Sequence, residues 1–430
     1  MKLSLWPGLI ILSFSSINIF SQSRLPQPTP TPSRVIVTNN LPAPTRIVQP
    51  TPLPIPVVVG RPRVVGDEED RTPDQDINEK PVRTQIQPTE FRTMSFGQIK
   101  NKIAEAKRVM QSKPLQTASQ DPAVATSLVR IAFYDWKSQG IDFVVVNKDT
   151  FLSIAADTQT VSSNGKPITL HTIRANGVNT PITLTDDSGQ TKLPLLVQYP
   201  VEKNGKFIET AYYMSTHPGL VNPEVVNAGR LYVRNVIEIA RDRLKEKGIT
   251  ILPKVADIAE RLATVEHVDH TRFRTEPSQN IFNDIFTLYA LNEGQTYRYS
   301  VSSAGAGGMV QMIPWTYQMI RSRYSNVGLM PDFVEGMRNH VNATQAMLLY
   351  MQMTWNDMNS SPTIANAVTD GIATQEQLMA AGYNSNPAKI SGYISRGGAE
   401  WTGLIPRETK IYLQIYGSLQ SYVPMTPRTR

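Results

Sequence analysis

Residues 288–314 read LYALNEGQTYRYSVSSAGAGGMVQMIP, and the interpretation of the whole chain depends on this stretch. An apolar helical run ends in a lone carboxylate, Glu293, which Gly294 follows at once. The segment at residues 302–311 is rich in glycine and alanine and leads into a second predicted helix. Backbones approach each other or a ligand closely where side chains are this small. The pattern predicts a cleft with one acid at its base.

The apolar run before Glu293 has the periodicity of a helix. Phe282, Phe286, Tyr289 and Glu293 follow one another at spacings of four, three and four residues, so they share one helix face. We therefore expect the carboxyl of Glu293 to lie against aromatic side chains. Such surroundings disfavour ionisation, as a general acid requires at neutral pH. On local physics alone, a solvent-exposed Glu at a helix end is the ordinary alternative.

Three blocks of sequence follow one another in the C-terminal part of the chain. The first block stands 9, 12, 15 and 18 residues after Glu293, at Ser302, Gly305, Gly308 and Gln311. The second block is AGYNSNP at residues 381–387, and the third is IPRETKIY at residues 405–412. The order and spacing of three separate blocks are far more specific than any one of them.

These blocks resemble the SLT-type lytic transglycosylases, which are relatives of goose-type lysozyme. Sequences of that family carry a Glu nine residues before S-x-x-G-A-x-G-L-M-Q, then A-Y-N-x-G, then P-x-E-T-x-x-Y. The resemblance covers about residues 250–425. Departures are Gly294 in place of Ser, Met309 and Val310 in place of Leu and Met, and Gly382 in place of Ala. They leave the acid in place and leave the shape of the cleft and the substrate preference open.

The resemblance implies a peptidoglycan lytic transglycosylase with Glu293 as its catalytic acid and base. The Glu would protonate the glycosidic oxygen between N-acetylmuramic acid and N-acetylglucosamine, and then deprotonate the muramic 6-hydroxyl that closes a 1,6-anhydro ring. One carboxylate suffices because the substrate's own hydroxyl replaces the water of other glycosidases. The resemblance implies that the glycan strand is bound by Ser302, Gly305, Gly308, Gln311, Tyr383, Asn384 and Glu408.

Two other functions are open on the sequence. A hydrolytic muramidase would use water with the same acid, and a second carboxylate across the cleft would favour it. A non-catalytic, wall-binding structural protein would keep the fold only for docking. No metal or organic cofactor is expected. The pentapeptide at residues 266–270, EHVDH, contains metal-ligand types, but we interpret it as an exposed polar linker between helices.

Composition favours a globular protein of two or three domains behind a distinct N-terminal region. The chain has 430 residues, 40% of them hydrophobic, which is enough for a sizeable core. Its net charge is +7, and residues 1–63 supply +6 of this through six Lys and Arg and no acids. The globular part is thus only mildly basic, which argues against a nucleic-acid partner. The absence of Cys excludes thiol catalysis and cysteine metal sites.

The N-terminal region predicts export to the bacterial periplasm or cell envelope. Residues 1–23 have a positive start, an uncharged run and a small-x-small cleavage site, as in a signal peptide. An uncleaved membrane anchor is the alternative, because the run is about long enough to cross a bilayer. Residues 24–93 form a linker whose Pro-rich first part favours extended polyproline II and cannot build a core. With an anchor, this linker would tether the ordered part to the membrane.

The rest of the chain predicts an α+β protein. Residues 94–221 read as a β-rich module of unknown role, and residues 222–430 as a mainly helical, lysozyme-like domain. Predicted strands lie at residues 142–147, 167–173, 192–199 and 206–213, with Asn-Gly or Ser-Gly turns among them. Ser95 and Gln98 predict a capped helix at the start of the module. Asp121-Pro122 predicts a second helix, which ends at Gly140.

Overall fold

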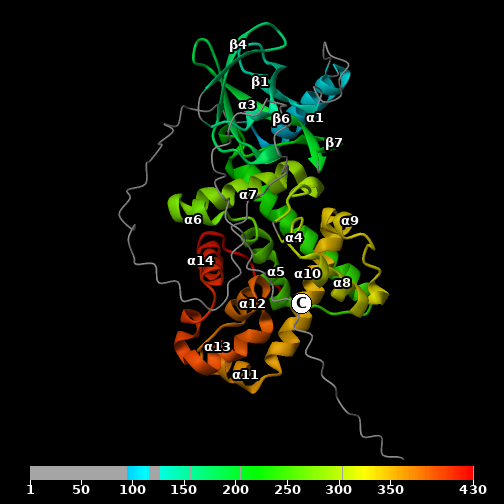
Figure 1. The fold of residues 1–430 in the computed structure, drawn as a ribbon, viewed down its shortest axis with the longest axis vertical. Coiled ribbons are helices and arrows are strands. Elements are labelled where there is room, and N and C mark those ends of the chain that lie inside the picture. The colour runs from blue at the N-terminus through cyan, green and yellow to red at the C-terminus, as the bar shows by residue number, and fades with distance from the viewer. Residues whose placement is uncertain are drawn as a thin grey trace, which may run out of the picture.

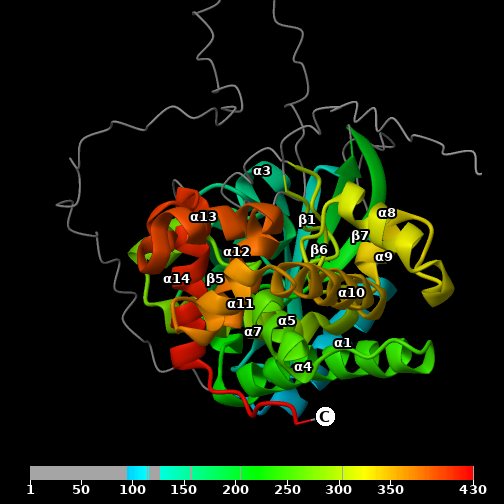
Figure 2. The same cartoon turned by 90° about the horizontal axis from the view of Figure 1, so that it is seen from below.

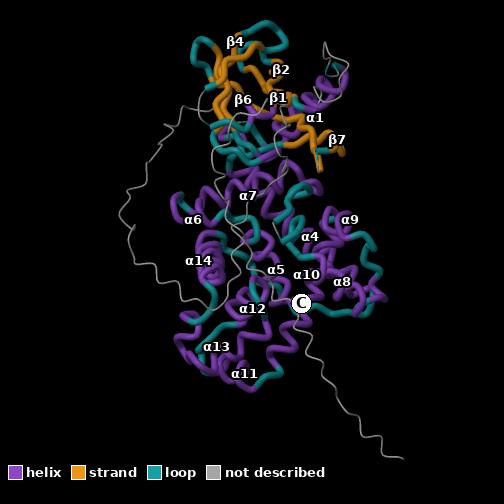
Figure 3. The backbone as a smooth tube through the Cα atoms, in the orientation of Figure 1, coloured by secondary structure: helices purple, strands orange, loops and turns teal. Residues whose placement is uncertain are grey.

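The computed structural model describes residues 94–113, 115, 126–154, 157–203, 205–302 and 304–429. The predicted leader, the Pro-rich linker and the Asp121-Pro122 helix start lie outside these residues. The described chain is α+β, as predicted. A curled antiparallel sheet gathers at one end of the molecule and helices make up the rest (Figures 1 and 3).

The first helix, α1 (Phe96–Ser112), begins as the sequence predicts. The Ser95 hydroxyl accepts a hydrogen bond from the Gln98 amide, and the Gln98 side chain accepts one from the Ser95 amide. This capping box satisfies two amides that have no partner inside the helix. The helix buries an apolar stripe of Ile99, Ala106 and Met110 beside the sheet.

The sheet has seven antiparallel strands in the order β2-β1-β6-β5-β4-β3, with β7 paired to β6. The strands are β1 (Leu128–Asp135), β2 (Gly140–Asn147), β3 (Thr158–Val161), β4 (Pro167–Thr172), β5 (Ile182–Asp186), β6 (Thr191–Lys203) and β7 (Lys206–Tyr213). A short helix, α3 (Lys148–Phe151), follows β2. The long strand β6 pairs with β1, β5 and β7, so it joins the two halves of the sheet.

The helix predicted to end at Gly140 is wrong over its described part, because residues 128–135 form strand β1. The spacing of Val129, Phe133 and Trp136 fits a helix, but Val129 and Phe133 also fall on one face of a strand. Both faces of β1 are buried: Val129, Ile131 and Phe133 join one core cluster, whereas Ala132 and Tyr134 join another. A strand covered on both sides lacks the alternation of polar and apolar residues that identifies strands. Pairing with β2 and β6 therefore decides the conformation.

The described residues from 223 onwards are mainly helical, as predicted. Their helices are α4 (Pro223–Glu246), α5 (Pro253–Val265), α6 (His270–Thr275), α7 (Ser278–Asn292), α8 (Pro314–Arg323), α9 (Phe333–Arg338), α10 (His340–Asn359), α11 (Pro362–Thr369), α12 (Gln375–Asn384), α13 (Ile390–Gly397) and α14 (Arg407–Tyr422). Helix α5 is buried on nearly all sides and contacts α4, α10, α12 and α14 (Figure 2). Because neighbouring helices pack around α5, the residues at its C-terminal end have a fixed position in the protein.

Helices α4 and α7 cross at a point where only glycine fits. A Cβ atom added at Gly229 would lie 1.9 Å from the carbonyl oxygen of Phe286. Such a contact forces the two backbones apart.

We therefore expect Gly229→Ala to lower the free energy of unfolding by about 1–3 kcal/mol or more. Gly417→Ala in α14 is the matched control, since nothing lies within 4 Å of its added Cβ. There the substitution should raise stability by about 0.5–1 kcal/mol, because Ala loses less backbone entropy in a helix. Urea unfolding measures both changes. Equal effects at the two positions would contradict the close crossing.

Two buried histidines make the fold sensitive to acid. The Nδ1 atom of His217 accepts a hydrogen bond from the Ile182 amide at 3.0 Å, and burial lowers the pKa of His217 to about 3. Burial likewise lowers the pKa of His340 to about 4; its Nε2 atom lies 2.7 Å from the Thr296 carbonyl oxygen. The ordinary value is 6.5, so the unfolded chain takes up protons first as the pH falls. The stability that depends on these two neutral histidines is therefore fully present above about pH 6.5 and is lost as the pH falls below that value.

We expect the free energy of unfolding to fall by up to about 1.4 kcal/mol per pH unit for each of these histidines between pH 6 and pH 4.5. His217→Asn keeps an acceptor near the Ile182 amide and removes the titrating group. Its stability should fall less steeply with pH, by up to about 1.4 kcal/mol per unit. Urea unfolding at several pH values gives the slopes. Identical slopes for the parent and the variant would show that His217 is not a source of the acid sensitivity.

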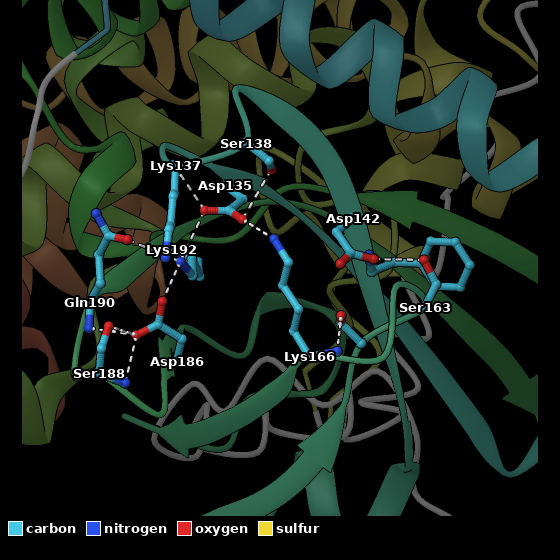
Figure 4. Close-up of polar contacts among 12 residues, drawn as sticks. Asp135, Lys137, Ser138, Asp142, Ser163, Lys166, Asp186, Ser188, Gln190 and Lys192 are labelled. Carbon is cyan, nitrogen blue, oxygen red and sulfur yellow. Dashed lines mark hydrogen bonds and ion pairs between the residues drawn. The ribbon is translucent and has the colours of Figure 1, made fainter.

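An ion-pair network ties three strands of the sheet together. Lys192 of β6 is buried, and its Nζ atom lies 2.9 Å from Asp135 Oδ1 and 2.7 Å from Asp186 Oδ2 (Figure 4). Asp135 ends β1 and Asp186 ends β5. Lys166 also reaches Asp135, with Nζ 2.8 Å from Oδ2. The network fixes the ends of β1 and β5 to β6 where the sheet curls.

Candidate functional site

Glu293 lies at the surface of the protein. Helix α7 ends at Asn292, and the backbone of Glu293 turns away with φ 42° and ψ −122°. Its carboxylate accepts a hydrogen bond from Lys100 Nζ of α1 at 2.6 Å, and 52% of the side chain is exposed. Phe282, Phe286 and Tyr289 form the predicted buried stripe. The predicted apolar surroundings of the acid are wrong, because the backbone of Glu293 leaves the helical conformation and takes its side chain off the stripe.

The glycine loop, residues 300–313, is folded on itself. The Ser302 hydroxyl accepts a hydrogen bond from the Ala306 amide at 3.0 Å. Gly305 and Gly308 have positive φ angles of 78° and 67°. A Cβ atom at Gly308 would lie 2.4 Å from the carbonyl oxygen of Met337 in α9. Glycine is thus needed at residue 308 for contact with the protein's own backbone.

Gln311 closes the same loop. Its Nε2 atom donates to the Gly308 carbonyl oxygen at 2.8 Å and to the Ser300 hydroxyl at 3.3 Å. The side chain is buried, and the backbone has φ 46°. In this conformation the side chains of Ser302 and Gln311 therefore hydrogen-bond within the glycine loop and stabilise its shape.

The second block packs on the first. The Tyr383 hydroxyl, at the end of α12, donates to the Val310 carbonyl oxygen at 2.7 Å. The ring of Tyr383 also meets Tyr350 of α10 edge to face, with centroids 5.8 Å apart. Tyr383 thus joins α12 and α10 to the glycine loop.

The third block packs on the second. The Thr409 hydroxyl in α14 donates to Asn384 Oδ1 at 2.9 Å. The Nδ2 atom of Asn384 is buried and has no hydrogen-bond partner among the described residues. Glu408 stands beside Thr409 in the first turn of α14. One helical turn along from Glu408, the Tyr412 hydroxyl donates to Glu266 Oε1 at 2.5 Å.

The first and third blocks contact Glu266 and His267, which directly follow α5. Glu266 is only 1% exposed. His267 Nε2 lies 2.9 Å from the Met309 carbonyl oxygen in the glycine loop. The imidazole stacks on the ring of Tyr297, with centroids 3.4 Å apart and planes at 3°. The first block thus reaches His267, and the third reaches Glu266.

The interpretation of residues 266–270 as an exposed linker is wrong. Glu266, His267, Val268 and His270 are all buried. Sequence reasoning did not single out Glu266 as a candidate acid, although a signal was present. Helix α5 is an apolar helix that begins with Pro253 and ends just before a Glu, which is the same pattern that drew attention to Glu293.

Backbone strain concentrates near this site. Among the described residues, four that are not glycine have positive φ: Gln139, Glu293, Tyr297 and Gln311. Three of the four lie within residues 293–311. Such conformations cost about 1–3 kcal/mol each and persist only where the surroundings enforce them. The loop between α7 and α8 is therefore held in shape by its contacts.

The described residues contain no group of three or more His, Cys, Asp or Glu that is arranged to hold a metal ion. Within the same residues, no helix combines the length and the apolar character needed to cross a membrane. Comparison with known proteins finds no matching family model and no significant match among curated proteins or solved structures. Function is therefore inferred from the three blocks and from the contacts between them.

Proposed function

We propose that the protein is a peptidoglycan lytic transglycosylase that cleaves the β-1,4 bond between N-acetylmuramic acid and N-acetylglucosamine. The observation that carries the proposal is the contact between the three blocks: Tyr383 joins the second to the first and Thr409 joins the third to the second. The first and third blocks also contact His267 and Glu266, through Met309 and Tyr412. The blocks are far apart in sequence, and each resembles a segment of the same family. Contact between all three supports a common site better than the sequence alone does.

We assign the acid and base role to Glu266, with Glu293 as the alternative that the spacing predicts. A general acid works best when its carboxyl is shielded from water and held in one orientation. Glu266 is shielded, and the Tyr412 hydroxyl holds its Oε1 atom. Glu293, by contrast, faces water and is paired with Lys100.

The chemistry proceeds in two proton transfers. Glu266 donates its proton to the glycosidic oxygen as the bond to the anomeric carbon breaks. The carboxylate then accepts the proton of the muramic 6-hydroxyl as its oxygen bonds to the anomeric carbon. The products are a strand with a 1,6-anhydromuramoyl end and a strand with a free 4-hydroxyl, and no water is consumed.

The burial of Glu266 adds a condition to the proposal. A sugar reaches the carboxyl only after part of its cover moves aside, and the glycine loop is the segment that contacts His267. Loop opening of this kind commonly precedes chemistry in enzymes with covered sites. We further propose that the protein is exported to the bacterial cell envelope, with peptidoglycan strands as its partner and its N-terminus as leader or membrane tether.

The test is digestion of purified peptidoglycan by the purified protein, followed by mass analysis of the soluble products. Anhydro products, one water lighter than those of a hydrolytic muramidase digest run in parallel, are expected. Products with the full mass would identify a muramidase instead. Binding without any soluble product would overturn the enzyme and favour a structural wall-binding protein.

A further inference from the structure

A small cavity of about 90 Å³ lies where the sheet meets the helical part, and we call it the seam cavity. The sheet side supplies the segment from β4 to β5, which includes the short 3-10 helix η1 (Gly177–Asn179). The helical side supplies residues from the α5–α6 connection, α6, α7 and the loop after α7, and these include the carboxylates of Asp269 and Asp284. The polar groups that matter below are Arg174, Asn179, His267, Arg272 and Tyr297.

Arg174 is a cation without a bonded partner in this cavity. No hydrogen bond or ion pair joins its guanidinium to another residue in the described part of the chain. Its neighbour Arg272 differs, since its Nη2 atom lies 2.7 Å from both Glu276 and Asp284 carboxylates. Burial lowers the pKa of Arg174, and the charge of Arg272 lowers it further. The charged form is therefore held at a cost that an anionic ligand would reduce.

Two uncharged groups on the cavity wall also lack partners. The Tyr297 hydroxyl and the Asn179 Oδ1 atom are buried and have no hydrogen-bond partner among the described residues. Tyr297 is 1% exposed and Asn179 is 3% exposed. Buried polar groups are normally bonded, so these two groups beside the partly exposed guanidinium of Arg174 point to a ligand. Because the Asn179 oxygen only accepts, that ligand must offer a hydrogen-bond donor as well as an anion.

We propose that the seam cavity binds a carboxylate of the stem peptide carried by the glycan strand, an inference that rests on the proposed function. The planar fork of Arg174 matches the two oxygens of a carboxylate, and the Tyr297 hydroxyl supplies a further donor. The carboxylates of Asp269, Glu276 and Asp284 also act on Arg174 and would repel a multiply charged phosphate more than a single carboxylate.

The position of the seam cavity fits this role. His267 lines the cavity and is the residue after Glu266. A strand with a sugar at Glu266 would therefore place the peptide of that sugar or its neighbour near Arg174. The β-rich module then has a function, since its β4–β5 connection would bind the stem peptide while the helical part cleaves the glycan strand.

Binding tests the proposal directly. The probe is a purified disaccharide tetrapeptide, titrated calorimetrically, and its fully amidated form is the comparison ligand. Arg174→Ala should weaken binding of the acid form by about 10- to 100-fold, as expected for a lost charged hydrogen-bond pair. Arg174→Lys should recover only part of this loss, because an ammonium lacks the fork. Arg243→Ala, at an exposed site on α4, is the matched control and should bind normally.

A milder variant guards against a folding defect. Tyr297→Phe keeps the ring that stacks on His267 and removes a hydroxyl that has no partner in the described structure. It should weaken binding by about 3- to 10-fold without lowering the melting temperature. Unchanged binding in both Arg174→Ala and Tyr297→Phe would overturn the proposal, as would equal binding of the amidated probe.

Digestion separates this inference from the proposed function. Arg174→Ala should lose activity on peptide-bearing peptidoglycan but act normally on strands freed of peptides by an amidase. If the parent cleaves both substrates and Arg174→Ala loses activity equally on both, the carboxylate site is wrong and the proposed enzymatic function is retained. If the parent cleaves neither substrate but binds the probe in an Arg174-dependent way, the proposed enzymatic function is wrong and the carboxylate site is retained.

Discussion

Glu266→Gln should lower the rate of glycan cleavage by about 10²- to 10⁴-fold, the usual contribution of a general acid and base. Glutamine has nearly the same shape and still presents an oxygen to the Tyr412 hydroxyl, so the fold should survive. It has no proton to donate to the glycosidic oxygen and accepts none from the 6-hydroxyl. Release of soluble fragments from peptidoglycan measures the rate, and circular dichroism on heating verifies the fold.

Glu293→Gln is the matched control, because it makes the same change at the other candidate acid. Its carboxylate is half exposed and bonds Lys100, so the variant should keep activity within about threefold of the parent and lose less than about 1 kcal/mol of stability. The reverse result, with Glu293→Gln inactive and Glu266→Gln active, would return the catalytic role to the residue that the spacing predicts. If both variants lose activity, peptidoglycan binding by each variant decides the assignment. The variant that still binds peptidoglycan has lost the catalytic acid.

Sequence reasoning succeeded where local chemistry decides the structure. The capping box at Ser95 lies where it was predicted, because caps act over a few residues. It failed at β1, where partners far along the chain choose a strand over a helix. Local pattern carries no information about such partners.

The candidate site shows a different limit. A spacing of nine residues before Ser302 selects Glu293, whereas Glu266 lies 36 residues before it. Helices α6 and α7 occupy the interval, and only their packing brings Glu266 close to the third block. Both Glu residues follow apolar helices, so the sequence offers two similar candidates. Both helices end one residue before the Glu, but the backbone of Glu266 stays in the right-handed region, with φ −57° and ψ −18°, whereas that of Glu293 has φ 42°. Which carboxyl is buried depends on this difference and on the packing around each Glu, which the local pattern does not carry.

The second large effect is expected in the sheet, where Lys192→Met should lower the free energy of unfolding by about 3–5 kcal/mol. Methionine fills the space but leaves the carboxylates of Asp135 and Asp186 without the buried ammonium that bonds both. Asp135 is 2% exposed on its side chain, so water cannot replace that bond. Lys166→Met is the matched control, because it removes the half-exposed ammonium from the same Asp135. That loss should cost less than about 1 kcal/mol.

The pH dependence of the Lys192→Met effect identifies its cause. Burial alone would raise the pKa of Asp186, but hydrogen bonds from Lys192 and Ser188 hold it down at about 2. The pKa of Asp135 is lowered as well; there burial is outweighed by Lys166 and Lys192. Both folded pKa values lie below the ordinary 3.8, so this stabilisation is complete above about pH 4 and is lost as the pH falls towards 2.

The loss of stability in Lys192→Met, measured against the parent at each pH, should therefore be largest near neutrality and shrink towards pH 3. A deficit that stays constant with pH would indicate lost packing, and a deficit equal to that of Lys166→Met would contradict the special role of the buried lysine. Because β4 and β5 flank the segment that carries Arg174, and Asp186 of this network ends β5, we expect peptide binding in the proposed seam-cavity site to weaken in Lys192→Met as well.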